Sequence, residues 1–139
     1  FVPTISLAEA LREIVAATLS SAYGKSFRVA AVHAEDPARE EKISLFRKRQ
    51  IYLLITTTIL ERGVTFPAID VVVLDAGHVV FDAAALVQIA GRAGRDAKDP
   101  TGEVIFIHDG KTDAMEKARN DIVLMNERAK RLLKGKESI

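Results

Sequence analysis

The chain has 139 residues, of which 48% are hydrophobic and 28% charged, with a net charge of +1 and no cysteine. This length and balance predict one folded domain with its own core, and the lack of cysteine excludes a disulfide framework and thiolate metal sites. No apolar run approaches the roughly 20 residues that span a bilayer, and the start does not resemble a signal peptide. The chain opens on FVPT without an initiator Met, so we expect a fragment of a longer protein.

The first half of the chain predicts helices and strands in alternation. Apolar residues at helical spacing predict a helix from Ser6 to about Tyr23, with Gly24 as its stop. The β-rich run FRVAAVHA follows. A second helix is expected over EDPAREEKISLFRKR, with Asp36 as its N-cap and Pro37 as its first residue. The continuous apolar run IYLLITTT then has the length and composition of a buried strand.

The second half continues this alternation. IDVVVLD predicts a strand, FDAAALVQIAGR a helix capped by Asp82, and GEVIFIHD another strand. A long closing helix is expected from Thr112 to about Gly135, and its apolar residues form one stripe: Met115, Ala118, Ile122, Met125, Ala129 and Leu132. Strands that alternate with helices predict an α/β fold, a three-layer domain with a mainly parallel β-sheet flanked by helices. Ligands of such sheets bind beyond the carboxyl ends of the strands.

The stretch QIAGRAGRD (88–96) is unusual for the end of a helix. Each glycine costs about 1 kcal/mol of helix stability relative to alanine, and an unpaired arginine is hard to bury. At about 100° per residue, Gln88, Arg92 and Arg95 fall on one face of a helix, and guanidinium forks suit phosphate oxygens. An anion site and a solvated helix end both fit this pattern. The glycines favour the anion site, because they allow a close approach.

Weaker signals lie elsewhere in the chain. In TTTILERGVTFPAID (56–70), hydroxyl groups at the end of a strand can contact phosphates, although threonine runs are also simply β-prone. Gly63 would allow another close backbone approach. His33 ends a predicted strand and fits a structural hydrogen-bonding role better than that of a catalytic base. Basic residues over 38–50 and 111–139 indicate either solvated helix faces or a surface that faces phosphates.

Two short stretches, GKS (24–26) and GKT (110–112), are similar to the end of a phosphate-binding P-loop. The full motif has another glycine five residues before the GK glycine, and Leu19 and Ile105 stand there instead. DAGH (75–78) holds one carboxylate where an acidic Mg²⁺ motif needs more, so it predicts a turn after a strand. No metal site and no nucleophile–base pair are expected.

Four stretches together resemble motifs IV, IVa, V and VI of superfamily 2 helicases, in the right order: FVPT, VHAEDPAREEKISLFR, LLITTTILERGVTFPAIDVVVLD and QIAGRAGRD. Within that superfamily, the chain looks most like the late-competence DNA-uptake helicases of transformable bacteria, the ComFA type. Primosomal PriA and recombination RecG helicases are its next relatives. The resemblance implies that residues 1–139 form the second, C-terminal RecA-like domain of an ATP-dependent single-stranded-DNA translocase.

The resemblance also implies roles for individual residues. Arg95 would be an arginine finger with Arg92 as its partner, and both would reach ATP and Mg²⁺ that are bound mainly by the N-terminal RecA-like domain of the same protein. Further contacts on the nucleotide side are expected from Gln88, Glu61, Gly63 and Thr65. The contacts to single-stranded DNA are expected from Thr4, His33 and Thr57. Many relatives carry Asp where this chain has Thr65, so the chain departs from the family there.

The Walker A and acidic Mg²⁺ motifs are absent from the sequence, so we expect no ATP hydrolysis by this chain alone. The full-length protein is expected to be a DNA-dependent ATPase or helicase in the cytoplasm or at the inner face of the cell membrane. Its expected partners are single-stranded DNA and membrane DNA-uptake or recombination proteins. Two alternatives stay open, a primosomal or recombination-type helicase and a non-motor module that binds single-stranded nucleic acid.

Overall fold

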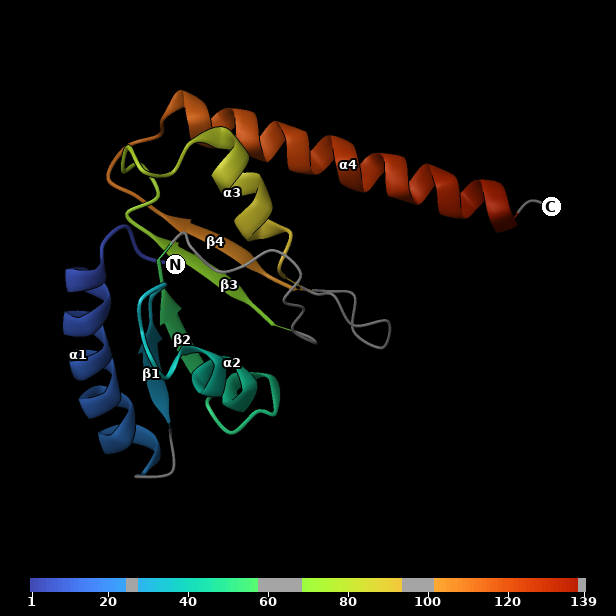
Figure 1. Ribbon diagram of the computed structural model, residues 1–139. Coiled ribbons are helices and arrows are strands. Elements are labelled where there is room, and N and C mark those ends of the chain that lie inside the picture. The colour runs from blue at the N-terminus through green and yellow to red at the C-terminus, as the bar shows by residue number, and fades with distance from the viewer. Residues whose placement is uncertain (25–27, 58–68, 94–101, 138–139) are drawn as a thin grey trace.

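The computed structural model describes residues 1–24, 28–57, 69–93 and 102–137, with side chains described as far as residue 132. Each of the four helices and four strands expected from the sequence is present (Figure 1). The elements in chain order are α1 (Ile5–Tyr23), β1 (Val29–Val32), α2 (Arg39–Arg47), β2 (Leu53–Thr56), β3 (Val71–Leu74), α3 (Ala83–Ala90), β4 (Val104–Ile107) and α4 (Asp113–Glu137).

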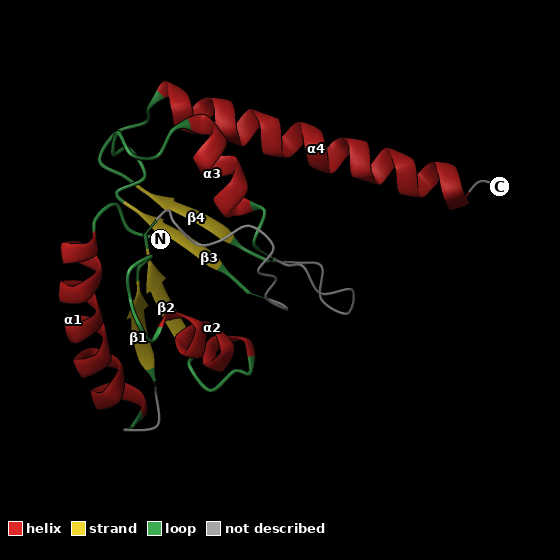
Figure 2. Ribbon diagram, viewed as in Figure 1, coloured by secondary structure: helices red, strands yellow, loops and turns green. Residues whose placement is uncertain are grey.

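The strands are parallel, which confirms the expected α/β class. Strand β1 pairs with β2, so that Val32 lies opposite Thr56, and β3 pairs with β4, so that Leu74 lies opposite Ile107. Within the described residues, these are two separate two-stranded sheets instead of one continuous sheet. Figure 2 shows α1 and α2 beside the β1–β2 pair and α3 and α4 over the β3–β4 pair.

The first two residues of the chain bridge the two strand pairs. The amino group of Phe1 donates to the Val72 carbonyl at 2.7 Å, and the Phe1 carbonyl accepts from the Leu74 N–H at 2.9 Å. Bonding to residues on either side of one partner is the pattern of a parallel ladder. The N–H of Val2 donates to the Thr56 carbonyl at 2.8 Å. Phe1 and Val2 therefore lie between β2 and β3 and hydrogen-bond to both.

Two apolar clusters stabilise the fold, one for each strand pair. One cluster combines β3 and the turn after it with α3 and α4, and its most deeply buried members are each 0% exposed: Val73, Ala76, Leu86 and Ala118. The other combines Val2 with residues of α1, β1 and β2, and Leu74 of β3 packs against it. Side chains of a strand alternate between its two faces, so β3 contributes to both clusters. Burial of apolar area on this scale is the dominant stabilising term of such a domain.

Side-chain caps fix several helix boundaries that the sequence predicts. The hydroxyl of Thr4 accepts from the Leu7 N–H at the start of α1, and the carboxylate of Asp82 accepts from the Ala85 N–H at the start of α3. Gly24 ends α1 with a φ of 90°, a conformation that suits glycine. Residues 75–80 form turns and bends after β3, as expected for DAGH.

The predicted start of the second helix is wrong by two residues. Helix α2 begins at Arg39, and its N-cap is Ala38, without a side-chain cap. The Asp36 carbonyl accepts from the Arg39 N–H, and the Asp36 carboxylate accepts from the Ala38 N–H at 2.8 Å. These bonds close a tight turn over residues 36–39, so Asp36 and Pro37 precede the helix instead of starting it.

The apolar stripe of the closing helix is buried only over its first turns. Met115 is 6% exposed and Ala118 is 0% exposed where α4 contacts α3, but Met125 is 47% and Leu132 is 70% exposed. A 25-residue helix is about 37 Å long, whereas a four-residue strand is about 13 Å long. Helix α4 therefore projects beyond the strands that it covers (Figure 1). Among the described residues, no helix combines the length and hydropathy that crossing a membrane requires.

Candidate nucleic-acid and nucleotide site

Three residues expected to contact single-stranded DNA meet at the carboxyl ends of the strands. His33 follows Val32 and Thr57 follows Thr56, and Val32 and Thr56 are paired in register. Neighbouring strands lie about 4.8 Å apart, so His33 and Thr57 leave the sheet side by side. Thr4 is two residues beyond Val2, whose N–H bonds to Thr56. The topology thus brings Thr4, His33 and Thr57 to one edge.

Thr4 combines a structural bond with a free donor proton. Its hydroxyl oxygen accepts from the Leu7 N–H at 3.1 Å, and the residue is exposed. A hydroxyl that accepts in this way can still donate its own proton, and a phosphate oxygen is a suitable acceptor. The N-terminus of a helix also carries a partial positive charge that favours an anion. Thr4 can therefore cap α1 and contact a phosphate at the same time.

His33 is held in a turn that fixes one of its ring nitrogens. Its Nδ1 accepts from the Glu35 N–H at 3.2 Å, so the neutral ring carries its proton on Nε2. The turn is anchored by Lys42, whose ammonium group donates to the Asp36 carboxylate and to the Ala31 carbonyl at 2.9 Å. The hydrogen bond from Lys42 is the main reason that the pKa of Asp36 lies below its ordinary value. This network presents the His33 imidazole as a hydrogen-bond donor through Nε2.

Thr57 lies at the expected edge but beneath the surface. The residue is 7% exposed, and its carbonyl accepts from the Thr56 hydroxyl at 3.3 Å. Thr4 is exposed and His33 is half-buried, so these two offer more polar surface to a ligand than Thr57 does. Of the three residues predicted to contact single-stranded DNA, Thr57 is therefore the least accessible to a ligand in this structure.

Arg92 lies away from this edge, near the amino ends of β3 and β4. Helix α3 starts beyond the carboxyl end of β3 and runs back along the strand pair (Figure 1). Its eight residues span about 12 Å and the four residues of β3 about 13 Å, so the helix ends level with the start of the strand. Arg92 lines the same cavity as Ile69 and Asp70, which precede β3. Arg92 therefore lies away from the carboxyl ends of β3 and β4, where ligands of parallel sheets usually bind.

The helix that carries Gln88 ends earlier than expected. Helix α3 stops at Ala90, and the Arg92 N–H donates to the Ile89 carbonyl at 3.0 Å. A bond over three residues tightens the last turn, so an angle of 100° per residue does not extend from Gln88 to Arg92. Gln88 is exposed and Arg92 is half-buried.

Several predicted site residues lie outside the part of the chain that the structure describes. They are Glu61, Gly63, Thr65 and Arg95. The face expected to unite Gln88, Arg92 and Arg95 stays a prediction.

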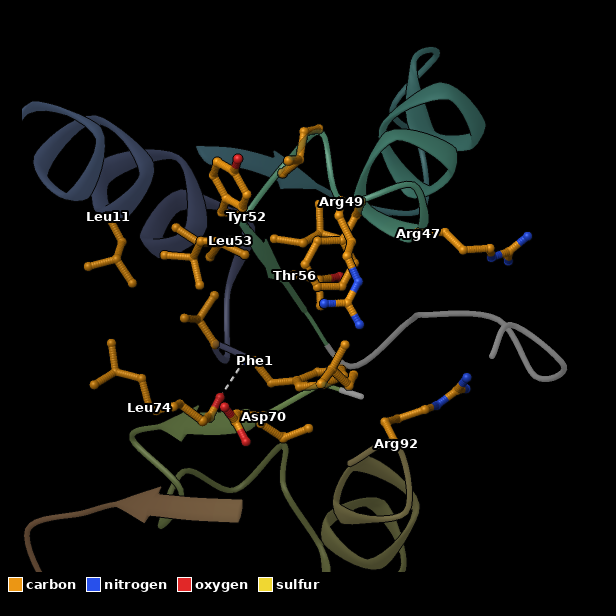
Figure 3. A pocket seen from close by; sticks show the side chains of 18 of the residues that line it. Phe1, Leu11, Arg47, Arg49, Tyr52, Leu53, Thr56, Asp70, Leu74 and Arg92 are labelled. Atoms are coloured by element: carbon orange, nitrogen blue, oxygen red, sulfur yellow. Dashed lines mark hydrogen bonds between the residues drawn. The ribbon is translucent and has the colours of Figure 1, made fainter. Parts of the chain in front are cut away.

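Two further arginines line the same cavity as Arg92, although the sequence does not mark either of them individually. Arg47 and Arg49 line the same cavity as Arg92, and Figure 3 shows the three side chains on one side of it. The basic residues over 38–50 were the available signal, because they indicated either a solvated face or a surface for phosphates. Sequence patterns do not show that this run lies on the same cavity as the end of α3 (Ala83–Ala90), because that placement depends on the tertiary structure.

Arg49 adopts a backbone conformation that glycine normally occupies. Its φ is 63°, its N–H donates to the Phe46 carbonyl at 3.0 Å, and the Gln50 N–H donates to the Leu45 carbonyl at 2.9 Å. These are the two bonds of a Schellman C-cap, in which the left-handed residue is usually glycine. A side chain there costs about 1 kcal/mol. The chain tolerates this cost and places a guanidinium at the mouth of the cavity.

The described residues offer cationic groups for an anion but no cluster for a cation. No group of three or more His, Asp, Glu or Cys within them could hold a metal ion. Guanidinium groups bind phosphate oxygens in two-pronged fashion. The arginine cluster, defined as Arg47, Arg49 and Arg92, therefore fits a phosphate better than a metal.

Residues 1–97 match the family model described as the helicase conserved C-terminal domain. This match covers more than half of the 139 residues. The chain therefore belongs to the helicase C-terminal domain family, as its four motifs predict.

Among the relatives in this family are competence proteins. The chain is 50% identical over 129 residues to the competence protein ComFA of Bacillus subtilis (strain 168), a match that covers 93% of this chain and 26% of that protein. It is 47% identical over 91 residues to ComFA of Streptococcus pneumoniae, which covers 66% of this chain and 21% of that protein. The chain thus spans about a quarter of the length of these relatives. The predicted similarity to the ComFA type is confirmed.

An RNA helicase and a solved structure are also similar. The chain is 36% identical over 131 residues to the ATP-dependent RNA helicase ROK1 of Pyricularia oryzae, which covers 93% of this chain and 17% of that protein. The structure of the C-terminal domain of the DEAD-box protein Dbp5 covers 92% of this chain and 67% of that chain, with a TM-score of 0.54 and 24% identity. This likeness confirms the expected RecA-like α/β fold.

Replacing Arg49 by Gly should stabilise the chain by about 0.5–1 kcal/mol, because glycine adopts the left-handed conformation without strain. Urea denaturation measures this change. The matched control is Lys48→Gly, one residue earlier, where φ is −80° and glycine should instead destabilise. A less stable Arg49→Gly chain would show that the Arg49 side chain stabilises the fold itself, and would contradict the prediction.

Proposed function

We propose that this chain is the second motor domain of an ATP-dependent translocase that moves on single-stranded DNA, of the kind that imports DNA during competence. One observation carries the proposal. Donors suited to a nucleic-acid backbone, Thr4 and His33, lie at the carboxyl ends of the strands, whereas α3 runs back along the β3–β4 pair and carries Arg92 towards the amino ends of these strands. A motor needs such a separation, because it must bind the DNA strand at one place and respond to the bound ATP at another. Identity to ComFA over most of the chain supports DNA uptake as the process.

The strand-binding edge, which consists of Thr4, His33 and Thr57, would bind the phosphate backbone of the DNA strand without contacting the bases. The Thr4 hydroxyl and the His33 Nε2–H donate to phosphate oxygens, and Thr57 completes the edge from the neighbouring strand. Donors of this kind recognise the backbone and carry no sequence information. Binding should therefore tolerate any sequence and weaken as salt increases.

The nucleotide-binding edge, the end of α3 that carries Arg92, would complete an ATP site on the first motor domain of the same protein. Arg92, with Arg95 as the finger proper, would lie against the γ-phosphate of ATP, and Gln88, Glu61, Gly63 and Thr65 would supply further contacts. Bound ATP with Mg²⁺ supplies the phosphoryl group that is transferred to water. The guanidinium groups stabilise the charge that develops on that group, an effect worth orders of magnitude in rate. Mg²⁺ would be held mainly by the first domain, as the resemblance to superfamily 2 helicases implies.

Helix α3 would connect the two edges mechanically. It is capped by Asp82 on the strand-binding side and ends next to Arg92 on the other. Closure of the two motor domains on ATP would move Arg92 towards the γ-phosphate. Reopening after hydrolysis would shift Thr4 and Thr57 along the DNA strand. In the competence process, this motor would work at the inner face of the cell membrane with the proteins that admit DNA.

Replacing Arg92 by Ala in the intact motor should lower the DNA-stimulated kcat of ATP hydrolysis by about 10²-fold or more, because stabilisation of the transferring phosphoryl group is lost. Steady-state ATPase assays with saturating single-stranded DNA measure this change. The affinity for DNA should stay within about twofold, since Arg92 lies away from the strand-binding edge.

Two variants control for the loss of charge and for folding. Arg92→Lys keeps the charge without the fork and should recover only part of the rate. Arg128→Ala removes an exposed arginine of α4 and should leave kcat unchanged. A thermal scan of each variant shows whether the domain is still folded. A folded Arg92→Ala motor with a wild-type kcat would exclude the proposed role.

Replacing Thr4 by Asp should weaken binding of single-stranded DNA by about tenfold at low salt without destabilising the chain. Aspartate caps helices as well as threonine does, so α1 should keep its stability. Its negative charge repels the phosphate that the hydroxyl is proposed to contact. Fluorescence anisotropy with labelled homopolymers measures this loss. Asn126→Asp, which adds the same charge to an exposed position on α4, is the matched control and should bind normally.

The same assay separates the motor from its alternatives. Equal stimulation of the ATPase by RNA and DNA would favour an RNA helicase, a possibility consistent with the similarity to ROK1. Tight strand binding without any nucleotide effect would favour a non-motor binding module. Normal transformation after deletion of the gene would exclude the role in DNA uptake and leave a primosomal or recombination-type helicase.

A further inference from the structure

A groove runs along the open side of β4. Strand β4 pairs with β3 on one side, and among the described strands it has no partner on the other. Helix α4 starts beyond the carboxyl end of β4 and runs back over the strand (Figure 1). Residues of β4 and α4 line a cavity of about 470 Å³ between them. This edge groove therefore joins an open strand edge to the side of one helix.

The open edge of β4 presents backbone groups to a ligand. The Glu103 carbonyl accepts from the Val71 N–H and the Ile107 carbonyl accepts from the Ala76 N–H, both at 2.9 Å, so the odd-numbered residues bond towards β3. Backbone groups alternate in direction along a strand. The N–H and C=O groups of Val104 and Phe106 therefore point to the open side, where no described strand pairs with them.

Apolar side chains surround these backbone groups. Val104, which is 37% exposed, and the half-buried Phe106 line the edge groove beneath α4. Val123 of α4 lines it from above and is 47% exposed. On the other face of β4, Ile105 and Ile107 are 47% and 48% exposed. An extended segment beside β4 would thus bury apolar surface on both of its faces.

The two ends of the edge groove differ in charge. Because α4 runs back over β4, its first turns lie over the carboxyl end of the strand (Figure 1). The exposed cationic side chains of Lys111 and Arg119 line the groove there, and Glu116 is the only carboxylate among its described lining residues. Ile122 and Val123 line it further along the helix. Complementary charge favours an occupant that is acidic at one end and apolar along the rest.

Strand β4 lacks the features by which natural strand edges avoid pairing. Such edges carry lysine, proline or a bulge, whereas β4 reads VIFI. An exposed apolar edge of this kind accepts a further strand, and main-chain bonds supply much of the affinity in this mode of peptide recognition. Thr4, His33 and Arg92 do not line the edge groove, so an occupant would leave them accessible.

We propose that the edge groove binds another protein by strand addition. An extended segment of that partner lies beside β4 and bonds to the N–H and C=O groups of Val104 and Phe106. Its acidic end lies near Lys111 and Arg119, and its apolar side chains pack against Val123. The partner attaches to the motor without covering the strand-binding edge or Arg92. Binding at this groove requires neither ATP nor DNA.

Two synthetic peptides test the site on the chain itself: Asp-Asp-Ile-Thr-Val-Thr-Val and the same residues in reverse order, one for each strand direction. With at least one of them at saturation, amide hydrogen exchange at Val104 and Phe106 should become about tenfold slower, because these N–H groups gain partners. The amides of Ile105 and Ile107 face β3, so they are internal references and should change much less. Peptides with Lys-Lys in place of Asp-Asp are matched controls and should protect less.

Reversing one charge of the edge groove should reverse the choice of peptide. The Arg119→Glu chain should bind the Lys-Lys peptide more tightly than the Asp-Asp peptide, by about threefold, as exposed ion pairs allow. Lys117→Glu makes the same change at an exposed position of α4 that does not line the groove, and should keep the original preference. Fluorescence anisotropy with labelled peptides measures both affinities, and a thermal scan shows that each variant is folded.

The contrary outcomes are distinct. Unchanged exchange at Val104 and Phe106 with both peptide orders would overturn the proposal, and equal slowing at Ile105 and Ile107 would do so by indicating general stabilisation. Equal affinity for the Asp-Asp and Lys-Lys peptides would exclude an acidic partner. Protection without peptide that grows with protein concentration would show that a second copy occupies the edge instead. The ATPase and DNA-binding assays depend on other residues, so the proposed function is tested independently.

Discussion

The arrangement of this domain depends on the backbone pairing of two residues, Phe1 and Val2, between β2 and β3. A parallel sheet is stable when each interior strand has a partner on both sides, and within the described residues the backbone bonds between the two strand pairs run through this short link. The apolar clusters follow from it. Val2 is buried in the cluster beneath α1, and Leu74 reaches that cluster from β3 because the link holds β3 close.

The functional surfaces follow from the direction of the strands. Parallel strands place all of their carboxyl ends together, so His33 and Thr57 leave the β1–β2 pair next to each other and Thr4 joins them through Val2. A helix that follows a parallel strand must run back along it, which takes Arg92 to the other end. The separation between the proposed DNA contacts and Arg92 is therefore a property of the βα unit. A two-domain motor would exploit this separation.

The arginine cluster shows where local and global requirements conflict. Arg49 stands at a C-cap position that favours glycine, which lowers the stability of α2 and its following turn. Residues held in strained conformations concentrate at functional sites, where a side chain is needed in spite of its cost. Arg49 lines the same cavity as Arg92, so under the proposed function its guanidinium would be available to a phosphate.

The sequence by itself determined the class of fold, the order of its elements, and the family. Periodicity, the cap at Asp82 and continuous apolar strands are local properties, so they could be predicted without knowing any contact. The tertiary structure decided what depends on distant partners. It moved the start of α2, because Asp36 bonds within a turn, and it buried Thr57. It also brought Arg47 and Arg49 into the lining of the cavity that Arg92 lines. It left half of the α4 stripe exposed, because the described strands beneath the helix are too short to cover it.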